Sequence, residues 1–128
     1  DQDLHLVAAN PITGRSNIMY TMHFYAGTHK QWLRDRTDEA IEKGIPIFVS
    51  ECAGMEASGD GPIDEAEWKL FVEWMESRKI SWISWSVSDK NESCSMLIPR
   101  ASSFGHWTDD LLKTWGKLTR QTIREKNL

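Results

Sequence analysis

The chain has 128 residues, which is enough for one ordinary domain with a hydrophobic core and too few for two. With 27% charged and 40% hydrophobic residues, its composition is typical of a folded protein rather than a disordered one. The net charge of −4 argues against nucleic acid or an anionic membrane as partner, because both favour clustered Lys and Arg. No apolar run approaches the roughly 20 residues that span a bilayer.

The basic cluster, the two cysteines and the N-terminal residues give little indication of function. The one basic cluster (Arg120, Arg124 and Lys126) is typical of a solvated helix end. Cys52 and Cys94 are too few for a disulfide framework and are expected as small buried side chains, with pairing between them left open. No Cys/His spacing suggests zinc, so the sequence predicts neither metal nor cofactor. The first residues have no signal-peptide pattern, but the chain does not begin with Met, so its location stays open.

Predicted strands and helices alternate along the chain. An earlier helix is expected to close over 4–10, and runs rich in β-branched and aromatic residues predict strands at 17–25, 45–50 and 80–86. Helical spacing predicts helices at 31–43, ended by Gly44, at 64–78 with Asp64 as N-cap, and from Thr114 through Leu118, Thr122 and Ile123. This alternation indicates a parallel α/β sheet covered by helices.

Each predicted strand is followed by polar and aromatic residues at its carboxyl end. In a (β/α)8 barrel that end carries the chemistry. A complete barrel takes about 250 residues, however, and three strands cannot close one. The sequence therefore predicts only part of such a barrel, with sheet edges and an apolar face left to be covered.

Glu51 is the strongest single candidate for chemistry. A carboxylate after the apolar run 45–50 is costly to bury unless it is paired with another group or has a functional role. The simple alternative is that Glu51 is an exposed loop residue just past the strand. His23 and Tyr25 are two apart on a predicted strand and so share one face. They can hold a nearby carboxylate ionised and aimed, or they can be a hydrogen-bonded pair at the rim.

Tryptophan is unusually frequent, with seven in the chain. Each one can serve a core rich in aromatic residues or stack on the apolar face of a sugar ring. Trp82 and Trp85 are three apart and face opposite ways on a regular strand. Trp85, which is nearer the carboxyl end, is the better candidate for a cleft.

Four segments carry a family resemblance: YTMHFYAGTH at 20–29, IFVSE at 47–51, GDG at 59–61 and SWSVSDK at 84–90. In this order and spacing the chain closely resembles glycoside hydrolase family 5, best its bacterial endo-β-1,4-glucanases (cellulases), over about residues 1–126. The resemblance implies that residues 1–128 are the C-terminal portion of one (β/α)8 barrel, with its sixth to eighth strands. It also implies retaining hydrolysis through a covalent glycosyl-enzyme.

The same resemblance implies roles for individual residues. Glu51 falls on the nucleophile, and His23 and Tyr25 fall on the pair that positions it. Trp85 falls on the indole that stacks beside the scissile bond. Lys90 and Glu92 fall on loop positions that bind sugar hydroxyls.

Two partners and a location follow from the resemblance. A β-glucan of the cellulose type is the expected substrate, and the N-terminal half of the same catalytic domain is the expected protein partner. The intact enzyme is expected to be secreted. Preference among β-glucans, xylan and mannan stays open.

The sequence departs from the family in two places. Cys52-Ala53-Gly54 stands where many relatives have an aromatic residue and then Gly, which can repack the strand end or alter a subsite. The Asn-Glu-Pro motif that carries the family's acid/base is absent, and Asn91-Glu92 is followed by Ser93. Glu56, Asp60 and Glu92 are poor substitutes because their loops serve other purposes in the family. The acid/base is therefore expected before Asp1, and a non-catalytic carbohydrate-binding fragment or an inactive truncated barrel are the alternatives.

Overall fold

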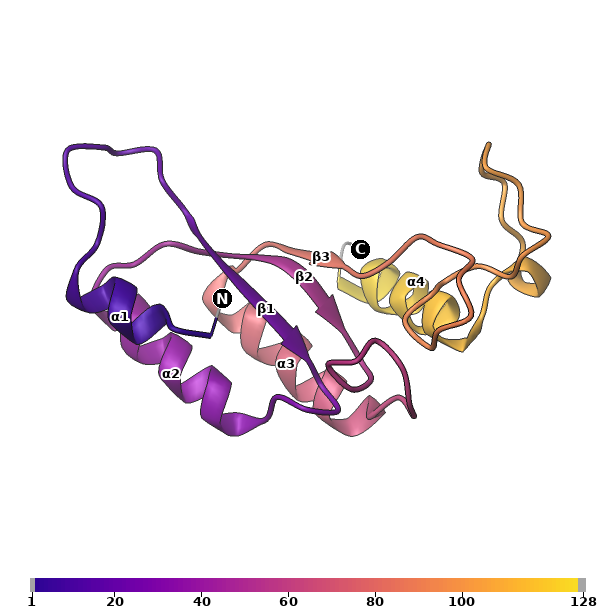
Figure 1. Ribbon diagram of the computed structural model, residues 1–128, viewed down its shortest axis with the longest axis horizontal. Coiled ribbons are helices and arrows are strands. Elements are labelled where there is room, and N and C mark those ends of the chain that lie inside the picture. Colours follow the sequence, from indigo (N-terminus) through magenta and orange to yellow (C-terminus); the bar gives the residue numbers. More distant parts are fainter. Residues whose placement is uncertain (1, 127–128) are drawn as a thin grey trace.

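The computed structural model describes residues 2–126, which form helices and strands in alternation (Figure 1). In chain order the elements are α1 (Leu4–Ala9), β1 (Tyr20–Tyr25), α2 (Gln31–Glu42), β2 (Ile47–Ala53), α3 (Glu65–Arg78), β3 (Trp82–Ser84), the short 3-10 helix η1 (Asp109–Leu111) and α4 (Thr114–Lys126). The strands make a parallel sheet in the order β1-β2-β3. The predicted parallel α/β fold is confirmed.

Helices α2 and α3 cover one face of the sheet (Figure 1). On that face Met22, Phe24 and Val49 are fully buried. The ring of Phe24 stacks on Phe71 of α3 with 3.9 Å between centroids. The opposite face is more open, since Thr21 is exposed and His23 is partly exposed.

A buried cation joins the two covering helices. Arg34 of α2 is only 3% exposed, and its guanidinium contacts the Glu67 carboxylate of α3. The same guanidinium lies 4.5 Å from the centroid of the Phe71 ring. The charge is therefore both paired and packed, which a buried cation requires.

Helix ends follow the predicted local signals. The Asp64 carboxylate accepts a hydrogen bond of 3.0 Å from the Glu67 backbone N–H, so Asp64 caps α3 as predicted. Gly44 follows α2 with a φ of +83°, a conformation that glycine adopts without strain. In α4, however, Ile123 is 44% exposed, because Trp115, Thr119 and Thr122 form the buried side.

Strand ends differ from the prediction. β1 begins at Tyr20 rather than at 17, because its first bond runs from the Tyr20 N–H to Pro46 O and its pairing with β2 starts with Tyr20 opposite Ile47. β2 runs to Ala53, so Glu51 lies inside the strand and not just after it.

The third strand is much shorter than the predicted run 80–86. Ile80 lies just past Lys79, the C-cap of α3, and its N–H bonds back to Met75 O in the last turn of that helix. After Ser84, the Ser86 N–H bonds to Cys94 O instead of continuing along β2. Only Trp82–Ser84 is strand.

The pairing of β1 with β2 contains a β-bulge. Met22 pairs with Val49 and His23 pairs with Glu51, so Ser50 is an extra residue in β2. Cys52 is fully buried like Val49, although the two are three residues apart. The bulge therefore leaves Ser50 and Glu51 together on the open face.

Two further features concern the whole described region. Cys52 and Cys94 are buried and unpaired, so the possible disulfide does not form. Across residues 2–126, none of the helices has the length and apolar character needed to cross a membrane.

Candidate active site

Glu51, Tyr25 and His23 come together on the open face of the sheet. The Tyr25 hydroxyl donates to Glu51 Oε1 at 2.5 Å. His23 Nδ1 lies 3.7 Å from the other carboxylate oxygen, Oε2. Two residues of β1 thus contact both oxygens of one carboxylate on the adjacent parallel strand β2.

The surroundings of Glu51 are neither dry nor fully solvated. The side chains of Glu51 and His23 are 23% and 32% exposed. The pKa of the Tyr25 phenol is held well above its usual value of 10.0. Burial of Tyr25 is the largest cause, and its hydrogen bond to the Glu51 carboxylate is the second. Tyr25 therefore stays protonated and remains a hydrogen-bond donor to Glu51 throughout the neutral range.

Trp85 follows β3 with 42% of its surface exposed, as an open stacking surface requires. Its backbone carbonyl accepts a hydrogen bond of 2.6 Å from Nε1 of Trp115 in α4. Trp115 is fully buried and packs edge-on against Trp68 of α3, with 4.8 Å between centroids. Trp82 also packs edge-on against Trp68, so Trp82 contributes to the core, whereas Trp85 is exposed.

Lys90 and Glu92 lie in the long loop between β3 and α4. Lys90 is exposed, and Lys113 Nζ contacts the Lys90 backbone carbonyl. The Glu92 carboxylate accepts from the Cys94 thiol at 3.6 Å. These contacts lie within the loop and its neighbours, rather than with the Glu51 group.

A polar contact fastens this loop to the loop between β2 and α3. Asp60 Oδ1 accepts from the Ser93 hydroxyl at 2.7 Å and from the Ser93 N–H at 3.1 Å. These hydrogen bonds lower the pKa of the Asp60 carboxyl, and the bond from the Ser93 hydroxyl has the largest effect. The Cys94 N–H also bonds to Gly59 O at 3.0 Å.

Cys52, the departure next to Glu51, points into the core. Its thiol is fully buried and donates to Ile83 O at 3.4 Å. The next glycine, Gly54, is also closely packed, because a Cβ there would lie 2.9 Å from both Ile63 and Trp115 side-chain atoms. The departure therefore acts on the packing behind the strand.

Sequence reasoning missed two residues beside the site. Ser50 contacts the ring of His23, with 2.9 Å between Oγ and Nε2. Trp115 supports the backbone of Trp85. A bulge has no local signature that would single out Ser50, whereas Trp115 at the start of a predicted helix could have been weighed as a core anchor.

Fold and site together define a parallel α/β protein with a carboxylate-centred site on strand-borne residues. Residues 1–91 match the model of the cellulase family, glycosyl hydrolase family 5. The chain therefore belongs to glycosyl hydrolase family 5.

Individual relatives agree with this assignment. The chain is 45% identical to endoglucanase 5 of Pectobacterium carotovorum over 96% of its own length and 24% of that protein's. A solved structure from Cytophaga hutchinsonii is 47% identical with a TM-score of 0.95, over 98% of this chain and 41% of that one. The catalytic domain of a Thermobifida fusca endoglucanase, solved with cellotetraose, is 34% identical with a TM-score of 0.85, over 94% of this chain and 39% of that one. The chain spans about a quarter of the length of the curated relatives it matches.

Proposed function

We propose that this chain supplies the nucleophile side of a retaining endo-β-1,4-glucanase site, with Glu51 as the nucleophile. The observation that carries the proposal is the contact of both Glu51 oxygens with side chains of the adjacent strand, the Tyr25 hydroxyl at 2.5 Å and His23 Nδ1 at 3.7 Å. A hydrogen bond and a polar ring beside the carboxylate fix its direction. An ionised, aimed carboxylate is what attack on an anomeric carbon requires.

In the proposed reaction, Glu51 attacks the anomeric carbon and forms a glycosyl ester as the leaving sugar departs. A second carboxyl group protonates the leaving oxygen and then activates the water that releases Glu51. In retaining enzymes this second group stands about 5–5.5 Å from the first.

Residues within the chain are poorly suited to be that second carboxyl group. A general acid at neutral pH needs a raised pKa, and the pKa of Asp60 is lowered by its bonds from Ser93. Glu92 accepts from the Cys94 thiol, and Glu56 is an exposed loop residue. We therefore assign the acid/base to a part of the barrel outside these 128 residues.

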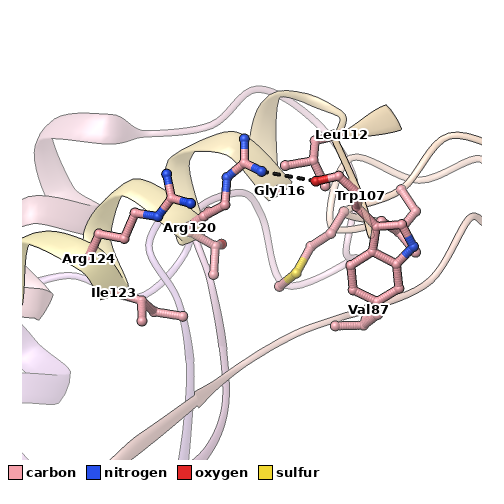
Figure 2. A pocket seen from close by; sticks show the side chains of 10 residues that line it. Val87, Trp107, Leu112, Gly116, Arg120, Ile123 and Arg124 are labelled. Carbon is pink, nitrogen blue, oxygen red and sulfur yellow. Dashed lines mark hydrogen bonds between the residues drawn. The ribbon is translucent and has the colours of Figure 1, made fainter. Parts of the chain in front are cut away.

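The same proposal makes strands β1 to β3 the sixth to eighth of a (β/α)8 barrel, completed by an N-terminal part. An apolar pocket of about 360 Å³ beside α4 offers that part a docking surface (Figure 2). Its walls include Val87, Leu112, Gly116 and Ile123, and Arg120 at the edge bonds to Trp107 O at 3.2 Å.

Substrate contacts are proposed at three positions. The exposed indole of Trp85 would stack on a glucose ring, and Lys90 and Glu92 would reach sugar hydroxyls further along the cleft. The related Thermobifida fusca enzyme holds cellotetraose, which supports a β-1,4-glucan as ligand. Because such a polymer does not cross a membrane, we place the intact enzyme outside the cell.

The decisive experiment uses a 2-fluoro cellobioside inactivator, which traps the glycosyl ester, on the complete gene product that carries this chain. Mass spectrometry of the peptides should find the added sugar on Glu51. Glu51→Gln should abolish labelling, and the matched loop variant Glu56→Gln should keep it. Label on another residue, or none on a folded protein, would contradict the assignment.

A second candidate function is carbohydrate binding without catalysis, which the lack of a suitable acid/base within the chain favours. The isolated 128-residue chain should then bind cello-oligosaccharides and show no turnover. Adding the N-terminal part of the barrel distinguishes the two candidate functions. Hydrolysis would support the glucanase, and binding without hydrolysis would support a non-catalytic carbohydrate-binding protein. Turnover by the isolated chain would overturn our placement of the acid/base.

A further inference from the structure

Ser50 occupies an unusual place for the residue before a candidate nucleophile. As the extra residue of the β2 bulge, it lies on the open face together with Glu51. Both residues meet the same imidazole: Ser50 Oγ lies 2.9 Å from His23 Nε2, and Glu51 Oε2 lies 3.7 Å from His23 Nδ1. His23 is thus held at both ring nitrogens by consecutive residues of one strand.

The chemistry of these groups selects one arrangement of protons. A neutral imidazole has one N–H donor and one acceptor nitrogen, and an ionised carboxylate only accepts. A serine hydroxyl can do either. If Ser50 donates to Nε2, then Nδ1 carries the proton and its N–H edge faces Glu51. The opposite tautomer sets an acceptor nitrogen against a carboxylate oxygen, which is repulsive.

We propose that Ser50 is a positioning residue that fixes the Nδ1–H tautomer and the ring orientation of His23 toward Glu51. Thr21 lies behind Ser50 on β1, with 3.4 Å between the two hydroxyl oxygens. The Ser50 hydroxyl could donate its single proton to Thr21 instead of to His23. The contact with Thr21 is long, however, and His23 Nε2, at 2.9 Å, is the better acceptor for that proton.

The bulge is what makes this arrangement possible. Successive residues of a regular strand face opposite ways, so Ser50 and Glu51 could not both reach His23. With the bulge, one ring joins the nucleophile candidate to its neighbour in the sequence. The catalytic consequence of this link rests on the proposed function, whereas the tautomer itself does not.

The test is ring-nitrogen NMR on the complete gene product, labelled with 15N-histidine. At about pH 8.5, well above the ordinary imidazole range, the two tautomers give distinct nitrogen shifts. The unmodified protein should show His23 as Nδ1–H, assigned by the loss of its signals in His23→Gln. Ser50→Ala should shift His23 toward Nε2–H, Ser50→Thr should restore Nδ1–H, and the exposed control Ser103→Ala should change nothing.

Three results would overturn the proposal. One is an Nε2–H tautomer in the unmodified protein, a measurement that does not depend on any variant folding. Another is an unchanged His23 tautomer in folded Ser50→Ala. Tautomer changes in Ser50→Ala that Ser50→Thr fails to reverse would also count against it, since Thr keeps the hydroxyl.

Kinetics provide a second readout on the same variants. Loss of one hydrogen bond that orients His23 should lower kcat of Ser50→Ala about 2- to 10-fold with little change in KM, and Ser50→Thr should recover most of it. Failure of the two proposals can be told apart. Absence of label on Glu51 with the Nδ1–H tautomer intact contradicts the glucanase alone, while labelled Glu51 with a tautomer insensitive to Ser50→Ala contradicts the role of Ser50 alone.

Discussion

Tyr25, a residue that is only 8% exposed, donates its phenolic hydrogen to Glu51 Oε1 at 2.5 Å. The bond joins neighbouring strands, so it depends on the fold and disappears when the chain unfolds. It also raises the energy of ionising Tyr25, because a phenolate would face a carboxylate.

The first prediction concerns stability at alkaline pH. Burial and the Glu51 contact raise the pKa of Tyr25 in the folded chain above the value of 10.0 for the free side chain. As pH rises above about 10, the unfolded chain loses this proton first and binds fewer protons than the folded one, so the free energy of unfolding falls. Below that pH the contribution is complete. Urea unfolding of the complete gene product should therefore show a smaller alkaline loss for Tyr25→Phe than for the unmodified protein.

The matched control for this prediction is Tyr20→Phe. It removes the other tyrosine hydroxyl of β1, which accepts from the Ile12 N–H, and leaves the Tyr25–Glu51 bond in place. Tyr20→Phe should keep the alkaline loss of the unmodified protein. Equal alkaline slopes for Tyr25→Phe and the unmodified protein would show that Tyr25 is not protected.

The second prediction concerns the exposed indole. Trp85→Ala should weaken cellotetraose binding about 10-fold, or about 1.4 kcal/mol, when measured by isothermal titration calorimetry. Trp32 of α2 is an apt control, because it is 41% exposed against 42% for Trp85. Trp32→Ala should leave the affinity unchanged. Equal losses in the two variants would argue against stacking at Trp85.

The third prediction concerns a glycine inside α4. Alanine is favoured over glycine in a helix by roughly 0.5–1 kcal/mol. At Gly116, however, a Cβ would lie 2.4 Å from Met96 O, a backbone atom that also accepts from the Lys113 N–H. Overpacking of this kind costs about 1–3 kcal/mol, so Gly116→Ala should lower the denaturation midpoint.

The neighbouring exposed residue Lys117 gives the control for Gly116. Lys117→Ala should change stability by less than about 0.5 kcal/mol. If Gly116→Ala proved as stable as Lys117→Ala, the segment around Met96 would be free to move away from α4.

The fourth prediction concerns the buried Arg34. Arg34 is 3% exposed, and Glu67→Ala would remove the carboxylate that pairs with its guanidinium. Breaking such a buried pair costs about 3–5 kcal/mol. The control Glu73→Ala removes an exposed partner of Lys69 on the same helix and should cost at most about 0.5 kcal/mol. Chemical denaturation of both variants measures the difference, and comparable midpoints would contradict a structural role for the Arg34–Glu67 pair.

Local signals made several elements predictable from the sequence. Asp64 caps a helix within its own turn, and Gly44 ends one, so neither depends on distant residues. The strand ends were harder, because pairing decides them: Tyr20 begins β1 only since Pro46 offers the first carbonyl. Ile80 looked like strand by composition, but the end of α3 holds its backbone.

The candidate site shows the same division. Spacing on one strand placed His23 and Tyr25 on a common face, and the structure brings both to Glu51. The contact of Ser50 with His23 depends on a register shift between two strands, which neither strand encodes alone. The Trp115 bond to the Trp85 carbonyl joins residues 30 positions apart and was equally out of reach.

The bulge at Ser50 changes the parity of β2. Before it, odd-numbered residues Ile47 and Val49 point into the core, and after it the even-numbered Cys52 does so. A strand of the same sequence without this phase shift would turn Glu51 toward the helices and Cys52 toward the open face. The extra residue in the bulge thus decides whether Glu51 is buried against the helices or accessible on the open face. An alignment that treats position 50 as an ordinary strand residue will assign the side chains after it to the wrong face of the sheet.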